Sequence, residues 1–372
     1  MNVHGYEVGL HRDEIDTPAL LLDLPVMERN LKRMAAYFEG VDVALRPHVK
    51  LHRATPILAH KQLQAGAIGL TCAKLTEAEV LAASGITDIL IANQIVGARK
   101  IQRLVNLASY TDVMVAVDRY DNVAELSAAA QARGVQLRVL VEVNIGHDRC
   151  GVDPLQPALA LSRAVHEAPG LRYMGLMGYD GHCTLGMEER ERERVSRQAN
   201  TLLAQTRRLI EEAGLKVEIV SAGGTFTYKY ASGIEGVTEI QAGTYLLMDT
   251  AFQEEGVRDF DCALTVLSTV ISRPSWKGSE FLAVIDEGSK GMSTLLGLPE
   301  IKDPEGATVI KFSQEHGRVD LEYAARDLRI GDKVELWVRD VNNTINLYDR
   351  FYALRDGVVE AVWEIPAVGN RT

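Results

Sequence analysis

Lys50 is the side chain of this sequence whose surroundings first suggest chemistry. It stands in RPHVKLHRA, residues 46–54, directly after the apolar run VDVAL, with two arginines and two histidines beside it. Like charges nearby lower the pKa of a lysine and favour the free amine, which can form a Schiff base with a carbonyl compound. We therefore predict that Lys50 is catalytic, with His48 as a second candidate. A solvated loop lysine is the alternative.

Two glycine-rich stretches further along the chain could hold a phosphate group. SAGGTFT, residues 221–227, offers two glycines and several hydroxyl groups, and IQAGTY, residues 240–245, offers another glycine. Backbone N–H groups that glycine leaves accessible bind phosphate oxygens well. Each stretch alone is equally typical of ordinary turns, but the pair in register predicts a phosphate cradle.

These groups need a framework, and the rhythm of apolar segments predicts one. Amphipathic helical stretches such as 74–85, 121–134 and 187–214 alternate with short apolar runs and end at or near a glycine. Eight runs are predicted to be strands: 43–48, 68–73, 88–93, 113–117, 138–144, 172–179, 217–222 and 238–242. This alternation predicts an α/β fold, a parallel (β/α)8 TIM-type barrel. Active sites of such barrels lie where strands end, and phosphate sites recur after strands seven and eight.

After residue 250 the pattern changes to a second, mostly antiparallel β domain. The runs 281–286, 333–338 and 358–365 are separated by GD and DG turns. The early run PALLLDL, residues 18–24, would be a ninth barrel strand, so we assign it to the β domain. The predicted domains are therefore a barrel over 25–250 and a β domain built from 1–24 and 251–372.

Composition narrows the classes of partner. The net charge of −11 and the pI near 5.4 argue against nucleic acid and against anionic membranes, which leaves small molecules and proteins. No apolar window approaches the roughly 20 residues of a spanning helix, and the polar start does not resemble a signal peptide, so we expect a cytoplasmic protein. The four scattered cysteines predict reduced thiols rather than disulfides or a zinc site.

A lysine at one strand end and a phosphate cradle at two others together indicate pyridoxal 5'-phosphate (PLP). The sequence resembles the fold-type III PLP enzymes with an alanine racemase-like barrel, and among them the D-threonine aldolase and D-serine dehydratase family. The resemblance covers nearly the whole chain. It rests on DTPALLLDL (16–24), RPHVKLH, NIGHDRCG (144–151), GLMGYDGH (175–182), SAGGT, IQAGTYLLMD (240–249), VIDEGSKGMS (284–293), QEHG (314–317) and NLYDRFYALRDG (346–357).

The resemblance implies roles for the matching positions. Lys50 would form the Schiff base with PLP, and Arg149 would stand near the phenolic oxygen of the cofactor. Gln241 would face the pyridine nitrogen, where the related alanine racemases carry an arginine. The phosphate would be held by Ser221, Gly223, Gly224, Thr225, Gly243 and Thr244.

The resemblance also implies a divalent metal, and here the sequence departs from the family. Related aldolases and dehydratases carry a His followed two residues later by Asp or Cys, ahead of a T-x-N-x-x-D stretch. In this chain Asp340 and Asn342 precede the matching TINLYD, residues 344–349. Oxygen ligands favour Mg²⁺ or Mn²⁺ over Zn²⁺. A polar turn without a metal is the alternative.

A second departure concerns the catalytic base. Several family aldolases carry a histidine six residues beyond the tyrosine that matches Tyr179, and this chain has Leu185 there. We predict that Tyr179 belongs to the site and that His182 replaces the missing base. The alternative is that His182 only caps the strand or packs.

The resemblance implies a PLP-dependent lyase of D-amino acid metabolism. It would cleave D-3-hydroxy amino acids by a retro-aldol reaction to glycine and an aldehyde, with a metal as a candidate activator. A D-serine dehydratase-like enzyme and a metal-free racemase are the alternatives, because the same Schiff base serves all three. A non-enzymatic PLP carrier is disfavoured, since such proteins consist of the barrel alone. The fold type further implies a homodimer with shared active sites.

Overall fold

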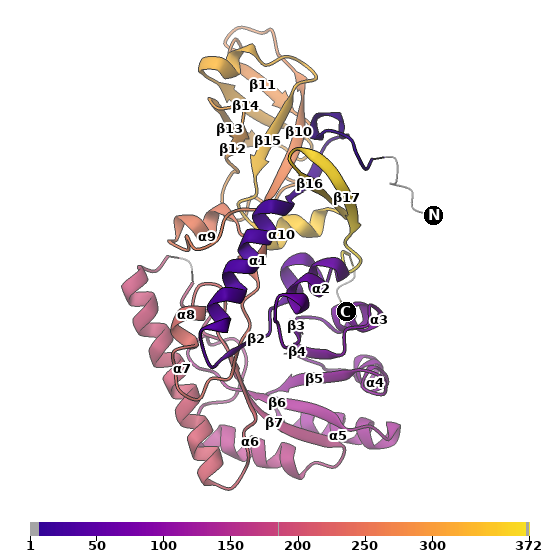
Figure 1. Cartoon of the computed structure of the whole chain (residues 1–372), viewed down its shortest axis with the longest axis vertical. Coiled ribbons are helices and arrows are strands. Elements are labelled where there is room, and N and C mark those ends of the chain that lie inside the picture. The colour runs from indigo at the N-terminus through magenta and orange to yellow at the C-terminus, as the bar shows by residue number, and fades with distance from the viewer. Residues whose placement is uncertain (1–6, 185, 370–371) are drawn as a thin grey trace. The chain divides into compact units, whose positions relative to one another are not determined.

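The computed structural model describes residues 7–184, 186–369 and 372. The chain divides into two compact units (Figure 1). One comprises residues 34–50 and 54–244, and the other residues 7–33, 51–53 and 245–369. The predicted boundary at residue 25 falls inside helix α1, Leu24–Glu39, whereas the two compact units divide between residues 33 and 34. The domain limits drawn from the sequence stay a prediction.

The first unit contains an eight-stranded, fully parallel sheet in the order β2-β9-β8-β7-β6-β5-β4-β3. Each predicted strand overlaps an observed one: β2 Ala44–Leu45, β3 Leu70–Cys72, β4 Asp88–Gln94, β5 Asp112–Val117, β6 Leu137–Glu142, β7 Leu171–Gly178, β8 Ile219–Ala222 and β9 Glu239–Ile240. The sheet closes because the Thr71 N–H donates to the carbonyl oxygen of Pro47 at 2.9 Å, next to a parallel bridge between His48 and Thr71. The predicted (β/α)8 barrel is therefore observed.

Helices connect these strands on the outside of the sheet. They are α2 Pro56–Gln64, α3 Leu75–Ala83, α4 Ala98–Leu107, α5 Tyr120–Arg133, α6 Gln156–Glu167, α7 Glu189–Glu212 and the short α8 Tyr228–Ala231. Helix α5 ends where Gly134 adopts a left-handed conformation with φ +71°, which glycine does without strain. Helix α7 buries Ser196, Ala199, Asn200 and Leu203 on one face, which anchors it against the barrel.

The interior of the barrel holds a cluster of buried apolar side chains. It consists of Leu90, Met114, Ala116, Leu140, Met174 and Met177, from four neighbouring strands. In a regular strand, positions 174 and 177 would face opposite sides of the sheet. Met174 and Met177 share this cluster because the pairing of β6 with β7 shifts before Gly175. A side chain at Gly175 would collide with the Ile219 carbonyl oxygen, so glycine is required at the bulge.

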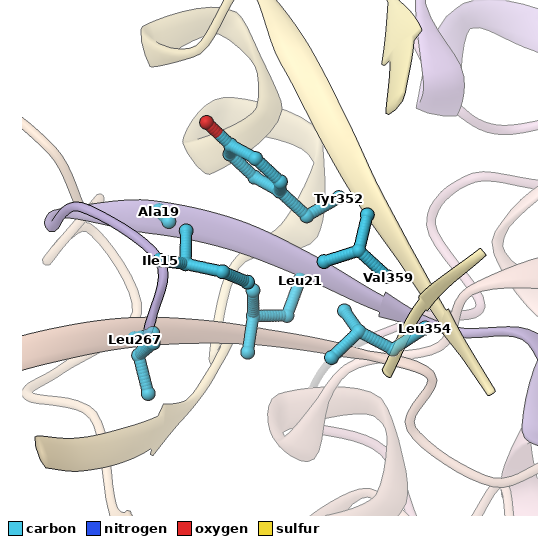
Figure 2. Close-up of a cluster of buried hydrophobic side chains, with 7 residues drawn as sticks. All are labelled: Ile15, Ala19, Leu21, Leu267, Tyr352, Leu354 and Val359. Atoms are coloured by element: carbon cyan, nitrogen blue, oxygen red, sulfur yellow. The ribbon is translucent and has the colours of Figure 1, made fainter. Parts of the chain in front are cut away.

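The second unit is a nine-stranded, mostly antiparallel sheet with the main order β13-β14-β11-β10-β1-β16-β17, and β15 pairs with β10 and β12. Its strands are β1 Ala19–Asp23, β10 Leu264–Ser272, β11 Leu282–Ile285, β12 Ile301–Asp303, β13 Ala307–Phe312, β14 Gly317–Leu321, β15 Lys333–Trp337, β16 Arg350–Arg355 and β17 Val358–Glu364. The unit also contains α9, Thr250–Glu254, and α10, Val341–Thr344. Strand β1 pairs antiparallel with β10 and parallel with β16. Figure 2 shows the result: Leu21 from the start of the chain packs with Leu267, Tyr352 and Val359 from its later part.

No helix among the described residues is long and apolar enough to cross a membrane. The four cysteines are free, as predicted.

Candidate functional site

Lys50 lies in a tight turn, Val49–His52, directly after the short strand β2. The buried Val49 anchors the turn, and the Lys50 N–H donates to Nδ1 of His48 at 3.3 Å. His48 is itself held by its N–H, which donates to the carbonyl oxygen of Ala242 at 3.2 Å. The sequence predicted a catalytic His48; the structure gives its Nδ1 a role in shaping the lysine turn, and a catalytic role stays a prediction.

The surroundings of the Lys50 amine lower its pKa and so increase its neutral fraction. Solvent reaches the side chain, yet protein atoms surround it, and this desolvation is the largest cause that holds its pKa below the usual value. The positive charge of Arg149 is the second cause, and Glu77, at the start of α3, opposes both. A neutral amine is the form that forms a Schiff base.

The positive charge that acts on Lys50 does not come from Arg46, its neighbour in sequence. Arg46, expected to crowd Lys50, is buried and forms ion pairs with Glu239 at 2.9 Å and with Asp88 at 3.0 Å. Its charge is therefore compensated at the seam between β2 and β9. The effective cation is Arg149, 99 residues away in sequence, and only the barrel brings it to Lys50.

Arg149 belongs to a rigid loop after β6. The side-chain oxygen of Asn144 accepts the N–H groups of Gly146 and Asp148, both at 3.1 Å. At the far end of the loop, the Gly151 N–H donates to Asp118 at 3.0 Å. These bonds explain the NIGHDRCG motif as a preformed loop whose backbone groups have local partners.

Tyr179 connects this loop to the end of β7. The Arg149 guanidinium lies 5.3 Å from the centre of the Tyr179 ring, and the His147 ring meets the same tyrosine edge-on at 5.4 Å. Burial, followed by the charge of Asp180, raises the pKa of Tyr179 to about 12, so its phenol is a proton donor. His182, the predicted base, stacks on His147 with ring centres 6.4 Å apart. Leu185 lies outside the described residues.

The predicted phosphate loop follows β8 and is tied to a buried carboxylate that sequence reasoning missed. The Gly224 N–H donates to the Thr227 hydroxyl at 3.2 Å, and that hydroxyl donates to Asp180 at 3.0 Å. Asp180 also accepts hydrogen bonds from Ser196 at 2.6 Å and from Asn200 at 3.0 Å, both on α7. The signal for Asp180 was its place in GLMGYDGH, directly after the strand end.

Two of the predicted cofactor residues contact each other after β8 and β9. The Gln241 amide donates to the Ser221 hydroxyl at 2.8 Å, and Ser221 is fully buried. Ser221 thus orients Gln241, while its predicted phosphate contact stays a prediction.

The four remaining phosphate candidates lie in the turns after β8 and β9. Gly243 is required for a backbone contact, because a Cβ there would lie 2.4 Å from the His48 carbonyl oxygen. Gly223 has φ +67°, Thr225 is buried and Thr244 is half-buried.

The residues present fit PLP. A Cβ added at Gly224 would meet only Tyr179, at 3.4 Å, so that side of the glycine-rich loop has space for a group to approach the backbone. Lys50 supplies the amine, and Arg149 a positive charge beside it. A lysine amine, a neighbouring cation and an accessible glycine-rich backbone are the groups that a phosphorylated carbonyl cofactor needs.

The metal role of Asp340 and Asn342 stays a prediction, and the structure gives Asp340 a different role. Asp340 is the N-cap of α10: one carboxylate oxygen accepts the Asn343 N–H at 3.3 Å, and the other accepts the Ser293 hydroxyl and the Asn343 amide, both at 2.7 Å. These three donors occupy most of the lone pairs of the Asp340 carboxylate, which is the one anionic group of the predicted pair. Asp340 is only 3% exposed. The structure therefore favours helix capping for Asp340. If Asp340 is engaged in this way, the predicted pair offers no anionic ligand beside Asn342.

One other group among the described residues has metal-ligand chemistry. Ligand atoms of Asp118, Glu142 and Cys150 lie within 4.8 Å of one another at the ends of β5 and β6. Each has a local reason to be there: Asp118 accepts the Gly151 N–H, and Glu142 accepts the Gln94 amide. Burial raises the pKa of the Cys150 thiol, which opposes formation of the thiolate that binds metals.

Comparison with known proteins agrees with this description. The model of the alanine racemase N-terminal domain matches residues 22–251, and that of the serine dehydratase domain matches residues 263–354. The D-threonine aldolase of an Arthrobacter species is 37% identical over 95% of this chain and 93% of its own length. The 3-hydroxy-D-aspartate aldolase of Paracoccus denitrificans is 34% identical over 98% of this chain and 97% of its own length. The crystal structure of D-threonine aldolase from Filomicrobium marinum has a TM-score of 0.92 at 37% identity, over 97% of this chain and 98% of that one.

A free lysine amine and a glycine-rich loop at the strand ends of a parallel barrel define a PLP-dependent enzyme. The match of the alanine racemase domain over the barrel and the similarity to whole aldolases make the family specific. The chain belongs to the fold-type III family of PLP enzymes. The family, the fold and the PLP cofactor predicted from the sequence are thereby confirmed.

Proposed function

We propose that this protein cleaves D-3-hydroxy amino acids to glycine and an aldehyde by a retro-aldol reaction. The observation that carries the proposal is the coverage of the aldolase relatives, which extends over both units of the chain. The D-stereochemistry and the hydroxylated side chain come from the names of those relatives. The residues of the barrel supply the groups that such a reaction needs.

Bound PLP would supply an electron sink for the bond that breaks at Cα. Lys50 would hold the cofactor, since its neutral amine is the nucleophile of the site. Arg149 would keep a positive charge beside that nitrogen, and Gln241, oriented by Ser221, would face the pyridine ring. The glycine-rich loop after β8 would bind the phosphate, with its conformation fixed by the hydrogen bond between Gly224 and Thr227.

Cleavage of a carbon–carbon bond also needs a base for the substrate hydroxyl. Loss of the hydroxyl proton lets the oxygen form the aldehyde carbonyl as the Cα–Cβ bond breaks. The ring layer of His147, Tyr179 and His182 offers imidazole nitrogens for this step. This step does not involve a metal at Asp340, whose carboxylate already caps a helix.

The test is a product assay with PLP-loaded protein. D-threonine, D-phenylserine, D-serine and D-3-hydroxyaspartate are incubated with and without Mg²⁺ or Mn²⁺, and glycine, ammonia and inverted amino acid are measured separately. Glycine plus an aldehyde is the expected result. Ammonia without glycine would show a dehydratase, and inverted substrate alone would show a racemase.

We also propose that the protein is a homodimer with shared active sites and that it works in the cytoplasm. The fold type supports the first point, and the four free cysteines, which suit a reducing compartment, support the second. Sedimentation of the holoenzyme tests the dimer. Mixing a Lys50→Ala subunit with a second inactive variant from the β unit tests shared sites, because activity should reappear only if one site draws on two subunits.

A further inference from the structure

His147, which sequence reasoning did not select, occupies the centre of the ring layer at the barrel mouth. Its ring meets that of Tyr179 edge-on, with the ring centres 5.4 Å apart, and stacks on that of His182, with the ring centres 6.4 Å apart. Two glycines leave room for these rings: a Cβ on Gly181 would lie 3.0 Å from His147, and a Cβ on Gly146 would lie 3.2 Å from His182. The chain is therefore shaped to hold an imidazole at this place.

The pocket that His147 lines contains few other groups that could accept a proton. The cavity is small, about 10 Å³, and Glu142, Arg149, Cys150 and Tyr179 also line it. Burial raises the pKa of the Cys150 thiol, which favours its protonated form. Arg149 is a permanent cation, and the phenol of Tyr179 keeps its proton because burial raises its pKa to about 12. Glu142 is buried, and its carboxylate already accepts a hydrogen bond from Gln94 at 2.5 Å.

His182, the base predicted from the sequence, is less suitable. Its Nδ1 is buried without a hydrogen-bond partner among the described residues, and the ring edge that carries Nε2 faces Gly146. His182 does not line the pocket with Arg149 and Tyr179. In contrast, His147 is half-buried in that pocket, and no described residue forms a hydrogen bond with either of its ring nitrogens.

The charges around His147 favour the neutral, proton-accepting imidazole. Burial is the largest cause that lowers its pKa, and Arg149 and His182 add to the effect. Asp148 and Asp180 act in the opposite direction but do not reverse it. A base needs this neutral form at physiological pH.

We propose that His147 is the base that accepts the proton of the substrate 3-hydroxyl group. This proposal rests on the proposed aldolase function. The O–H proton passes to a ring nitrogen of His147, the Cβ–O bond becomes the aldehyde carbonyl, and the Cα–Cβ bond breaks with its electron pair left on the glycine portion. That carbon then takes a proton, so D-threonine yields acetaldehyde and glycine without any other reactant.

The experiment compares His147→Gln with His182→Gln, a matched change in the neighbouring ring of the same stack. D-threonine cleavage is measured from pH 5 to 9, and exchange of the glycine α-hydrogen in D2O is measured beside it. Glycine exchange needs the cofactor and Lys50 but no hydroxyl proton transfer. The visible absorption of bound PLP and the melting temperature report on assembly and folding.

We expect His147→Gln to lose roughly 100-fold or more in cleavage while glycine exchange stays within about threefold of wild type, and His182→Gln to lose far less. In the wild type, the cleavage rate should fall as the pH drops below the pKa of His147. The residual cleavage rate of His147→Gln should not show this fall. Added imidazole should restore cleavage in His147→Ala.

Two results overturn the proposal in different ways. A His147→Gln enzyme that cleaves D-threonine at the wild-type rate would show that the base lies elsewhere, with the aldolase function intact. A wild-type protein that exchanges glycine but cleaves no D-3-hydroxy amino acid would refute the aldolase function itself, and the role of His147 with it.

Discussion

The Thr227 hydroxyl donates to the buried carboxylate of Asp180 at 3.0 Å and accepts the N–H of Gly224 at 3.2 Å. One hydroxyl group therefore joins the predicted phosphate loop to the end of β7. Because Asp180 is also bonded to Ser196 and Asn200, the conformation of the loop is fixed before any phosphate arrives. Preorganisation of this kind strengthens binding by removing an ordering cost.

Thr227→Val should weaken PLP binding about tenfold, since a nearly isosteric side chain leaves the Gly224 N–H without its partner. A titration of apoenzyme with PLP measures the effect. Thr206→Val is a matched control, because Thr206 is an equally buried threonine bonded to Leu202 within α7, away from the site. It should lower the melting temperature without changing PLP affinity. Equal affinities in Thr227→Val and wild type would contradict the linkage.

Arg149→Met should raise the pKa of the Lys50 amine. The positive charge is the second cause of the lowered pKa, so the shift is partial and desolvation remains. An amine reacts when it is neutral, so the pH midpoint of visible-band formation with PLP should move upward in Arg149→Met and stay close to wild type in Arg149→Lys. Lys50→Ala should form no band at any pH. An unchanged midpoint in Arg149→Met would exclude the charge effect.

Gly224→Ala and Gly243→Ala should fail for different reasons. At Gly224 an added Cβ has ordinary contact with Tyr179 at 3.4 Å, so the protein should fold while the methyl group obstructs the approach of the phosphate. At Gly243 the Cβ would collide with the His48 backbone at 2.4 Å, so stability should fall first. Melting curves of both apoproteins and their PLP affinities separate the two cases. If Gly224→Ala bound PLP with wild-type affinity, the phosphate would have to bind at another place.

EDTA should leave the aldolase rate unchanged, because Asp340 serves as a helix cap. Asp340→Ala should cost about 0.5–2 kcal/mol of unfolding free energy, and Asp340→Ser, which retains a capping oxygen, should cost less. Denaturant titrations measure both values. If EDTA abolished activity and Mn²⁺ restored it, the metal role of Asp340 and Asn342 would stand and the capping interpretation would be incomplete.

Glu287 should make the protein less stable as the pH rises. Its carboxyl is buried against the Tyr348 hydroxyl, and burial raises its pKa to about 7, whereas the unfolded value is about 4.3. Between these values the folded state binds more protons than the unfolded state, so the free energy of unfolding falls with increasing pH. Glu287→Gln removes this titration. The stability of the variant relative to wild type should therefore increase from pH 5 to pH 7.5, as measured by denaturant titration, and a constant difference would refute the assignment.

Much of the fold could be predicted because the barrel strands are apolar on both faces and end in glycine or polar turns. The eight strand positions followed from that pattern alone. Long-range electrostatics could not be predicted in the same way. Arg46 lies four residues from Lys50 in sequence, but its charge is compensated by ion pairs with Glu239 and Asp88. The distant Arg149 is the arginine that lowers the pKa of Lys50.

The candidate site shows the same limit. Local sequence selected Lys50 and the glycine-rich loop, and motif resemblance selected Arg149. Asp180 and His147 were missed, since their importance depends on side chains that meet only in the folded barrel. A polar residue directly after a buried strand was the available signal for Asp180, and none distinguished His147 from an ordinary loop residue.

The seam of the barrel has a consequence for the order of events during folding. Strands β2 and β9 contribute only two residues each, and the buried Arg46–Glu239 ion pair across them joins positions 193 residues apart. Contacts between such distant positions close late, because a long loop must first be ordered. Lys50 follows directly after this seam, and Gly243, which lies against the His48 backbone, follows the last barrel strand. We therefore expect the cofactor site to be complete only after the residues around Gly243 have joined the barrel.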